Sequence, residues 1–295
     1  MDKQQLKAEL LTLLKDKTLF DESNLNARME AIDYIEFAGQ ALRVPGQDLG
    51  LGELYQEAAS LRVQLVETNE ALFQRVHADL QARNYTRESL RAFLMEFTDF
   101  DSENRDHPRF EFDGLDALLA SVLLLPDAPS ESQVRESGMI RYEPTPANII
   151  LELIDSIRFT PYDIFFDVGS GYGLVVMLVN LLTGVPSVGI EYDPAYCDFA
   201  RSCAEALNLN DVTFIQADAR YVDLNSGTIF YLFTPFVNEI YDNVLESLRY
   251  TAIRHQIYIC SYGTITYELA KIPWLQIRDP AMEHDFKLAI FTSNV

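Results

Sequence analysis

The sequence predicts an α/β protein, in which a mostly parallel sheet flanked by helices follows an all-helical N-terminal domain. Two observations predict the sheet: from residue 136 on, short apolar segments rich in β-branched and aromatic residues alternate with helical segments, and a glycine-rich turn follows the first of them. The helical domain is predicted by apolar residues that recur at helical spacing through the first 135 residues.

Three stretches carry the helical pattern. Leu6, Leu10, Leu13 and Leu14 would share one face of a first helix. The apolar positions of residues 54–80 predict one long helix or two shorter ones. Thr86 is expected to cap a further helix, because a threonine hydroxyl accepts hydrogen bonds from the first free N–H groups of a helix.

The polar, turn-rich stretch "PDAPSESQVRESG" at residues 126–138 marks the expected boundary between domains. We therefore predict a helical domain at residues 1–135, which caps the site, selects the substrate or mediates interactions, and a second domain at residues 136–295.

In the second domain the expected strands alternate with four expected helices. Such alternation predicts a parallel sheet covered on both faces, whose ligands bind beyond the carboxyl ends of the strands. The strands are expected within residues 163–168, 186–192, 212–218, 228–236, 255–262, 274–279 and 286–293, and the helices within 146–157, 173–184, 194–208 and 237–252.

Composition limits the classes of function. The 45 acidic residues outnumber the 23 basic ones, giving a net charge of −22, which disfavours nucleic acid and anionic membranes as partners. The three cysteines show no metal-site spacing and no disulfide framework, so no metal is expected. The charged N-terminus lacks a signal-peptide core, and no stretch predicts a membrane helix. We expect a cytoplasmic protein.

The segment "DVGSGYG" at residues 167–173 admits three interpretations: a phosphate cradle, a nucleoside site, or only a tight turn between strand and helix. A dinucleotide fingerprint needs a third glycine at a spacing that this segment does not provide. Asp167 would repel a pyrophosphate, but it could serve a ligand that carries an ammonium and a sulfonium. S-adenosylmethionine is such a ligand.

Two further acids end the next two expected strands. Glu191 could accept both hydroxyls of a ribose, a feature that NAD enzymes share. Asp218 suits the exocyclic amine of an adenine, and the backbone N–H of Ala219 suits a ring nitrogen. Together the three motifs would lie along one cofactor.

Residues 163–236 resemble the class I S-adenosylmethionine-dependent methyltransferases: "DVGSGYG", "GIEYDP" and "QADAR" are similar to the first three motifs of that family, in order and spacing. The resemblance implies a Rossmann-like, seven-stranded sheet whose last strand is "FKLAIFTS". It also implies S-adenosylmethionine as cofactor, S-adenosylhomocysteine as product, and these cofactor-binding residues: Tyr142, Thr145, Asp167, Gly169, Ser170, Gly171, Tyr172, Gly173, Glu191, Tyr192, Asp218, Ala219 and Phe233.

The substrate side of the site is expected at "FTPF", residues 233–236, because in this family the residues after the fourth strand face the transferred methyl group. Many base- and glutamine-modifying members have Asn or Asp where this chain has Thr234. The lack of that amide or carboxyl group disfavours those substrates. Phe236 could wall the pocket or contact a cation through its ring. The alternative is a turn with a packing aromatic residue.

The segment "YEPTP" at residues 142–146 resembles, more weakly, a loop of the lysine-directed, non-SET methyltransferases. Thr145 is also expected to cap the following helix, with Pro146 at its first position. We take Tyr142, Thr234 and Phe236 as the candidate catalytic residues. The four histidines, His77, His107, His255 and His284, are scattered and expected to be surface or packing residues, so no general base is identified.

These observations predict a methyltransferase that acts on a protein, with lysine as one option, or on a small molecule. A cofactor-binding protein without catalysis is the alternative, because the substrate-side residues are undistinguished. A nicotinamide-dependent oxidoreductase is disfavoured by the missing glycine. The oligomeric state is not determined by the sequence.

Overall fold

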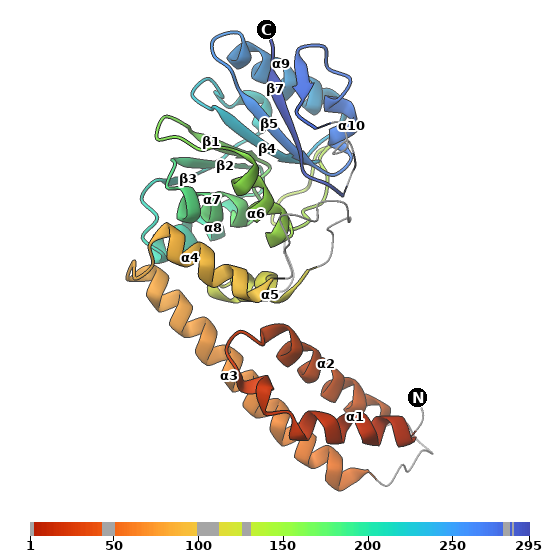
Figure 1. Cartoon of the computed structure of the whole chain (residues 1–295). Helices are drawn as coiled ribbons and strands as arrows, with labels where there is room; N and C mark the ends of the chain where they lie inside the picture. Colours follow the sequence, from red (N-terminus) through yellow and green to blue (C-terminus); the bar gives the residue numbers. More distant parts are fainter. Residues whose placement is uncertain (1–2, 43–50, 99–111, 126–130, 280–283, 285) are drawn as a thin grey trace.

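The structure of the chain is a computed structural model that describes residues 3–42, 51–98, 112–125, 131–279, 284 and 286–295. Figure 1 shows a helical bundle at the N-terminal end, a sheet flanked by helices at the C-terminal end, and one long helix that runs from the first to the second.

The N-terminal bundle consists of α1 (Lys3–Lys15), the short 3-10 helix η1 (Lys17–Phe20), α2 (Leu25–Leu42) and the first half of α3 (Gly52–Gln81). The stretch at 54–80 therefore forms one helix and not two. The helices enclose a core of their own, built from apolar residues at helical spacing: Leu6, Leu10, Leu19, Ala31, Ile35, Ala38, Leu51, Ala58, Leu61 and Leu65.

A buried arginine joins the parts of this bundle. The guanidinium of Arg28 donates hydrogen bonds to the carbonyl oxygens of Leu19 (2.9 Å) and Asp21 (2.8 Å) and to the side chain of Asn69. Burial lowers the pKa of Arg28, and these acceptors compensate part of the lost hydration.

The second half of α3 packs in a different core. Its residues Leu72, Val76 and Leu80 join α4 (Arg87–Leu94), η2 (Met95–Phe97) and α5 (Gly114–Val122) against α6 (Ala147–Ser156), α7 (Leu174–Thr183) and the sheet. Thr86 caps α4 as predicted, with its hydroxyl accepting from Ser89 N–H at 3.1 Å. The domain boundary at residue 135 stays a prediction, and the shared core extends across it. Residues 126–130 of the expected linker lie outside the described residues.

All seven expected strands form one sheet with the order β3-β2-β1-β4-β5-β7-β6. The first five strands are parallel, whereas β7 runs antiparallel to β5 and β6. The predicted fold class is confirmed: this is a seven-stranded, Rossmann-like sheet. The strands are β1 (Phe165–Val168), β2 (Ser187–Glu191), β3 (Val212–Gln216), β4 (Ile229–Phe233), β5 (Tyr258–Tyr262), β6 (Leu275–Ile277) and β7 (Ala289–Ser293).

Alternate residues of the strands enter the cores on the two faces of the sheet. Phe165 of β1 lies in the core with α6 and α7, and Phe166 lies in the opposite core with α9 (Asn238–Ala252) and α10 (Ile265–Leu269). The helix α8 (Pro194–Ala206) contacts β2 and β3 on the α7 side. Asp167 is two residues after Phe165, so its side chain lies on the α6–α7 face.

The capping role expected for Thr145 was wrong. Pro146 is the cap of α6, and the helix begins at Ala147, without a side-chain bond from the cap residue. The N–H of Ala147 instead donates to Asp116 of α5 at 2.7 Å, while the Thr145 hydroxyl lies 3.1 Å from the hydroxyl of Tyr231. The Asp116 carboxylate thus accepts the N–H that a cap side chain would accept, and the Thr145 hydroxyl contacts Tyr231 instead.

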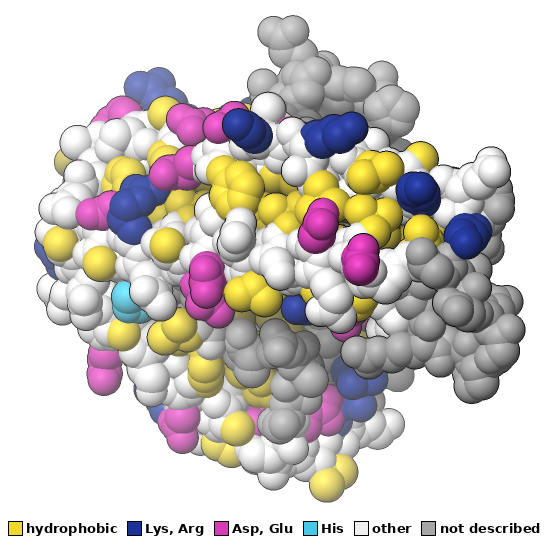
Figure 2. Space-filling model, turned by 90° about the horizontal axis from the view of Figure 1, so that it is seen from below, with side chains coloured by type: hydrophobic (Ala, Val, Ile, Leu, Met, Phe, Trp, Pro, Cys, Tyr) yellow, Lys and Arg dark blue, Asp and Glu magenta, His cyan; other side chains and the backbone are white. Residues whose placement is uncertain are grey.

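Figure 2, which views the bundle end of the molecule, shows a band of hydrophobic side chains bordered by Lys and Arg and interrupted by acidic residues. Phe20, Phe37 and Val63 of the bundle are among the exposed apolar residues. An interaction role for this part of the chain stays a prediction. In the described part of the chain, no helix has the length and apolar character needed to cross a bilayer.

Asp116 gives the fold a predicted pH dependence. Burial raises the pKa of Asp116 to about 6, although the N–H groups of Asp113 and Ala147 favour its carboxylate. Because the folded state holds this proton more tightly than the unfolded chain, its contribution to stability is present below pH 4 and is lost as the pH rises through 6. In the Asp116→Asn variant, which cannot bind this proton, roughly 2 kcal/mol of the decrease in unfolding free energy with rising pH should be absent.

Urea unfolding at several pH values between 4 and 7 gives the free energy of unfolding as a function of pH. The slope of this dependence should differ between the wild type and the variant. The substitution also weakens one hydrogen bond, which adds an offset without pH dependence. Glu205→Gln, at an exposed position of α8, is the control. Equal slopes for the wild type and Asp116→Asn would contradict the prediction.

Candidate active site

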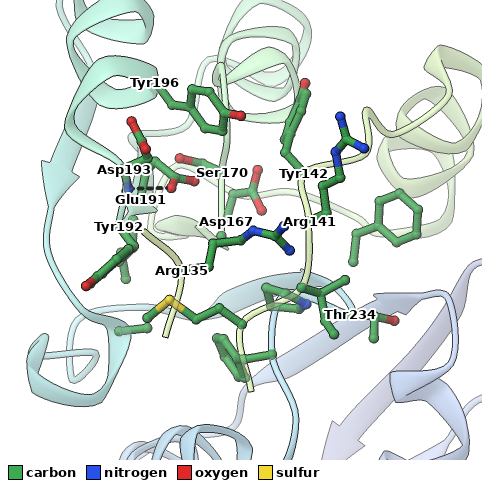
Figure 3. Close-up of a pocket in the computed structure, with 18 of the residues that line it drawn as sticks. Arg135, Arg141, Tyr142, Asp167, Ser170, Glu191, Tyr192, Asp193, Tyr196 and Thr234 are labelled. Atoms are coloured by element: carbon green, nitrogen blue, oxygen red, sulfur yellow. Dashed lines mark hydrogen bonds between the residues drawn. The ribbon is translucent and has the colours of Figure 1, made fainter. Parts of the chain in front are cut away.

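A cavity lies at the carboxyl ends of β1, β2 and β4, where the strand order reverses between β1 and β4. Ligands of open α/β sheets bind at such switch points. Its empty volume is about 1020 Å³, including space open to solvent, and its described lining residues lie between Glu131 and Ile240. Figure 3 shows side chains from several strand ends and from the segment before α6 pointing into it.

The glycine turn after β1 takes the backbone angles that the sequence predicts. Gly169, Gly171 and Gly173 have φ of +96°, +52° and +81°, where L side chains are strained. Their missing side chains also make room for neighbours, since a Cβ would collide with Pro235 at Gly169, with the ring of Tyr142 at Gly171 and with Phe214 at Gly173. At Gly171 the close approach is therefore made by Tyr142 of the chain itself.

Asp167 is a carboxylate buried in the cavity wall, with 3% of its surface exposed. Burial raises its pKa well above the ordinary value, and the nearby Glu191 raises it further. No described residue donates a hydrogen bond that lowers this pKa, so the charged form has no compensating partner within the described chain. Buried, uncompensated carboxylates of this kind concentrate at functional sites.

Glu191 ends β2 beside Asp167 and connects two turns. Its carboxylate accepts the N–H of Gly171 at 2.7 Å and the N–H of Asp193 at 2.8 Å. Burial raises the pKa of Glu191, whereas these backbone bonds oppose the rise. Each oxygen retains a second lone pair, so the carboxylate can still accept bonds from a ligand.

Among the residues that the structure describes, two hydroxyls of the cavity have no hydrogen-bond partner: Ser170 Oγ, on the glycine turn, and Tyr196 Oη, on α8. Both residues are buried. The ring of Tyr196 lies 5.5 Å from that of Tyr142 and 4.6 Å from that of Tyr172, measured between centroids. Unpartnered buried hydroxyls beside an uncompensated carboxylate are the donor set that a polar ligand would satisfy.

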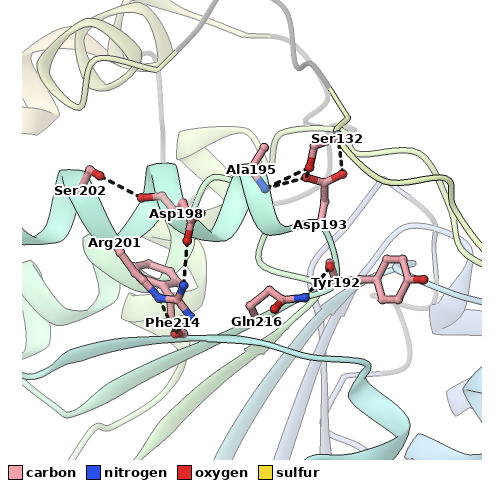
Figure 4. A network of polar contacts seen from close by, with 9 residues as sticks. All are labelled: Ser132, Tyr192, Asp193, Ala195, Asp198, Arg201, Ser202, Phe214 and Gln216. Carbon is pink, nitrogen blue, oxygen red and sulfur yellow. Dashed lines mark hydrogen bonds and ion pairs between the residues drawn. The ribbon is translucent and has the colours of Figure 1, made fainter.

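The segment of residues 131–145, which we call the strap, crosses the cavity and is anchored to the sheet. Asp193 caps α8, since its carboxylate accepts a hydrogen bond from Ala195 N–H at 2.8 Å. The same carboxylate accepts hydrogen bonds from the strap: from the N–H of Ser132 (2.7 Å), the N–H of Gln133 (2.9 Å) and the Ser132 hydroxyl (2.8 Å). Figure 4 shows part of this network. These bonds outweigh its burial and lower its pKa. One carboxylate thus holds both a helix and the strap.

A second anchor involves Asp218. Its carboxylate accepts two bonds from the Arg220 guanidinium, at 2.5 and 2.9 Å, and the Arg220 backbone N–H, and Arg220 also pairs with Glu136 of the strap at 2.5 Å. Arg220 lowers the pKa of Asp218. An adenine amine would share this carboxylate with a guanidinium, so the adenine role of Asp218 stays a prediction.

The strap meets the substrate-side turn through backbone contacts. Ile140 N–H donates to Pro235 O at 3.0 Å, and Val237 N–H donates to Gly138 O at 2.8 Å. Thr234 has a φ of +38°, an outlier for a β-branched residue, and its hydroxyl accepts from Ile265 N–H at 3.2 Å. Phe236 is buried and lines the cavity.

The structure brings most of the predicted site residues to the cavity wall. Gly171, Tyr172 and Gly173 do not line it: the ring of Tyr142 packs against Gly171, and Phe214 packs against Gly173. The roles of all these residues remain predictions. The predicted residues that line the cavity are Tyr142, Thr145, Asp167, Gly169, Ser170, Glu191, Tyr192, Asp218, Ala219, Phe233, Thr234 and Phe236.

Sequence reasoning missed several residues of the site. The acid–proline pair at Asp193 is a helix-start signal that could have drawn attention to this residue. Tyr196 carries no signal, since an aromatic residue on a helix is typical of packing. Arg135 and Arg141 also line the cavity, in a chain where basic residues are few.

The residues expected to be inert occupy structural positions. Cys197, Cys203 and Cys260 are free and buried. His77 bonds Val122 O at 2.8 Å and His255 bonds Gly227 O at 2.9 Å, while His107 lies outside the described residues. Among the residues that the structure describes, no group of acids, histidines and cysteines could hold a metal ion.

Residues 135–228 match the family described as "Histone methylation protein DOT1". The C-terminal half of the chain has a class I methyltransferase fold. The match spans residues 135–145 of the strap, the glycine turn and the first three strands, and it supports S-adenosylmethionine as the cofactor. It also agrees with the weaker resemblance to the non-SET, lysine-directed group. No curated protein matches the chain.

Solved structures that resemble the chain are distant methyltransferases. An RNA methyltransferase from Salinibacter ruber in complex with S-adenosylhomocysteine is 21% identical with a TM-score of 0.40, covering 52% of this chain and 94% of that chain. The putative methyltransferase YhhF from Escherichia coli is 16% identical with a TM-score of 0.42, covering 54% and 89%. A putative caffeoyl-CoA O-methyltransferase from Staphylococcus aureus is 14% identical with a TM-score of 0.42, covering 51% and 85%.

The glycine turn yields a prediction about stability. Gly171→Ala should lower the free energy of unfolding by about 1–2 kcal/mol because alanine is strained at the left-handed backbone angle of this position. The collision of the new methyl group with Tyr142 should lower it further. Gly52→Ala is the matched control, since nothing lies within 4 Å of its Cβ position and its φ is not positive. Combining Gly171→Ala with Tyr142→Ala should recover the part due to the collision.

Chemical denaturation of the four proteins measures these differences. An equal stability for Gly171→Ala and Gly52→Ala would contradict the packing of Tyr142 on the turn.

Proposed function

We propose that this protein is an S-adenosylmethionine-dependent methyltransferase that acts on an amine of a protein, with lysine as the acceptor residue. The observation that carries the proposal is the convergence of uncompensated polar groups on one cavity: the buried carboxylate of Asp167 and the unpartnered hydroxyls of Ser170 and Tyr196. They lie where a class I fold binds its cofactor.

The residues present fit the cofactor by charge. Asp167 would accept hydrogen bonds from the ammonium of the methionine end, and the cation would compensate the buried carboxylate. Glu191 would accept the ribose hydroxyls with its remaining lone pairs. The cofactor supplies the activated methyl group, so the protein's task is to align the acceptor and exclude water.

The substrate side supports an acceptor with an aliphatic arm. Phe233, Phe236 and the strap residues Met139 and Ile140 line the cavity around the turn at Thr234. The Thr234 hydroxyl is engaged with Ile265 N–H, so we assign Thr234 to the shape of this turn. A net charge of −22 favours a basic protein over a nucleic acid as the partner.

Calorimetry with S-adenosylhomocysteine tests the cofactor site. The wild type should bind, and the affinity should fall as the pH falls from neutral, because Asp167 must be ionised to meet the ammonium and its raised pKa makes protonation easier. Binding should release protons, seen as a dependence of the heat on the buffer. Asp167→Asn should bind at least tenfold more weakly and lose this proton release.

Asp198→Asn, at an exposed position of the neighbouring helix α8, is the control and should bind as the wild type does. Wild-type protein that binds NADH and not S-adenosylhomocysteine would refute the cofactor assignment.

Transfer of labelled methyl from the cofactor tests the acceptor. Core histones and a lysine-rich peptide should become labelled, whereas the same peptide with its lysine amines dimethylated beforehand should take up much less label. Label that appears only on small molecules would exclude the protein acceptor. Tight binding of S-adenosylhomocysteine with no transfer to any fraction of a cell lysate would favour a binding protein without catalysis.

A further inference from the structure

Tyr196 places a buried hydroxyl without a partner among the groups of the candidate active site. The residue is 3% exposed, and its Oη has no hydrogen-bond partner in the described part of the chain. Leaving a buried hydroxyl unpaired destabilises the free protein, because its bonds to water are lost and not replaced. A ligand that accepted a bond from this hydroxyl would remove that cost.

The hydroxyl shares a space with the acids of the site. Burial raises the pKa of Tyr142, and the electrostatic influence of Asp167, Tyr196 and Glu191 raises it further, so these three side chains lie near its hydroxyl. Figure 3 shows Tyr196, Tyr142, Asp167 and Ser170 around the same part of the cavity. Tyr196 thus faces the region next to the glycine turn, where the methionine end of the cofactor would lie.

In this position Tyr196 acts as a donor. Burial raises the pKa of Tyr196 to about 12, and the charges of Glu131, Asp193 and Glu191 contribute in the same direction. The hydroxyl therefore keeps its proton at neutral pH and offers it to an acceptor atom of the ligand.

The methionine end carries an ammonium and a carboxylate on the same carbon. Asp167 suits the ammonium, but Asp167 and Glu191 both repel the carboxylate, which then needs hydrogen-bond donors close by. Ser170 and Tyr196 are the buried cavity residues with unpartnered hydroxyls. We propose that Tyr196 donates a hydrogen bond to the carboxylate of the bound cofactor, with Ser170 as a second donor, an inference that rests on the proposed function.

Tyr196→Phe tests the proposal, because it removes the hydroxyl and keeps the ring. The dissociation constant for S-adenosylhomocysteine should rise about tenfold or more. The affinity for 5′-methylthioadenosine should not change, since this compound keeps the adenine, ribose and sulfur but lacks the carboxylate. Tyr241→Phe is the matched control: its hydroxyl is also buried and unpartnered, but it lies on α9 and does not line the cavity, so binding should be unchanged.

The melting temperature of the free protein separates binding from packing. Tyr196→Phe should melt at or above the wild-type temperature, because an unpaired hydroxyl is removed without loss of the ring. A lower melting temperature with weaker binding of both compounds would show that the change disturbs the fold, which contradicts the proposal.

The remaining outcomes are distinct. If the wild type does not bind S-adenosylhomocysteine, the proposed function fails. If the wild type binds and Tyr196→Phe binds equally well, only this inference fails. An equal loss for both compounds in a protein of unchanged stability would assign the contact to the ribose and overturn the carboxylate assignment.

Discussion

The architecture of the site depends on a carboxylate buried without a cation. Asp167 is the penultimate residue of β1 and lies in the wall of the cavity, and its neighbour Glu191 adds a second negative charge. Burying an unpaired charge is unfavourable for folding, so the surrounding structure has to impose this position. Within the described structure, no cation compensates the carboxylate, since burial and Glu191 both raise its pKa. The resulting field favours a cationic ligand.

The anchors of the strap come from three strands of the sheet, β2, β3 and β4. Asp193 follows β2, Arg220 follows β3, Tyr231 lies in β4, and Pro235 follows β4. Parallel strands place their carboxyl ends at one edge, so these residues, distant in the sequence, lie within reach of a single segment. The alignment of the strap over the cavity is therefore a consequence of the sheet order.

Much of this arrangement could be predicted, because it depends on local signals. The alternation of apolar segments predicted all seven strands, and the glycine spacing with Asp167 and Glu191 predicted where the cavity would be. These features depend on residues close in the sequence or on the general geometry of parallel sheets.

What escaped prediction depends on contacts between distant segments. Thr145 looked like a helix cap, but Asp116 from another helix takes the N–H that a cap would take. Asp218 lies two residues after the end of β3, where its carboxylate pairs with Arg220, which also pairs with Glu136. A guanidinium two residues away has no signal in spacing alone. Tyr196 is an aromatic residue on a helix, and only its position shows that its hydroxyl is unpaired.

The long helix α3 bears on the kind of acceptor. Its 30 residues span about 45 Å, with the first half in the core of the bundle and the second half in the core of the sheet. A continuous helix thus connects the bundle to the core of the sheet. Because the described lining of the cavity begins at Glu131, a bundle that selects the substrate must contact it outside the cavity. A protein acceptor can reach both places at once, whereas a molecule small enough to fit the cavity cannot.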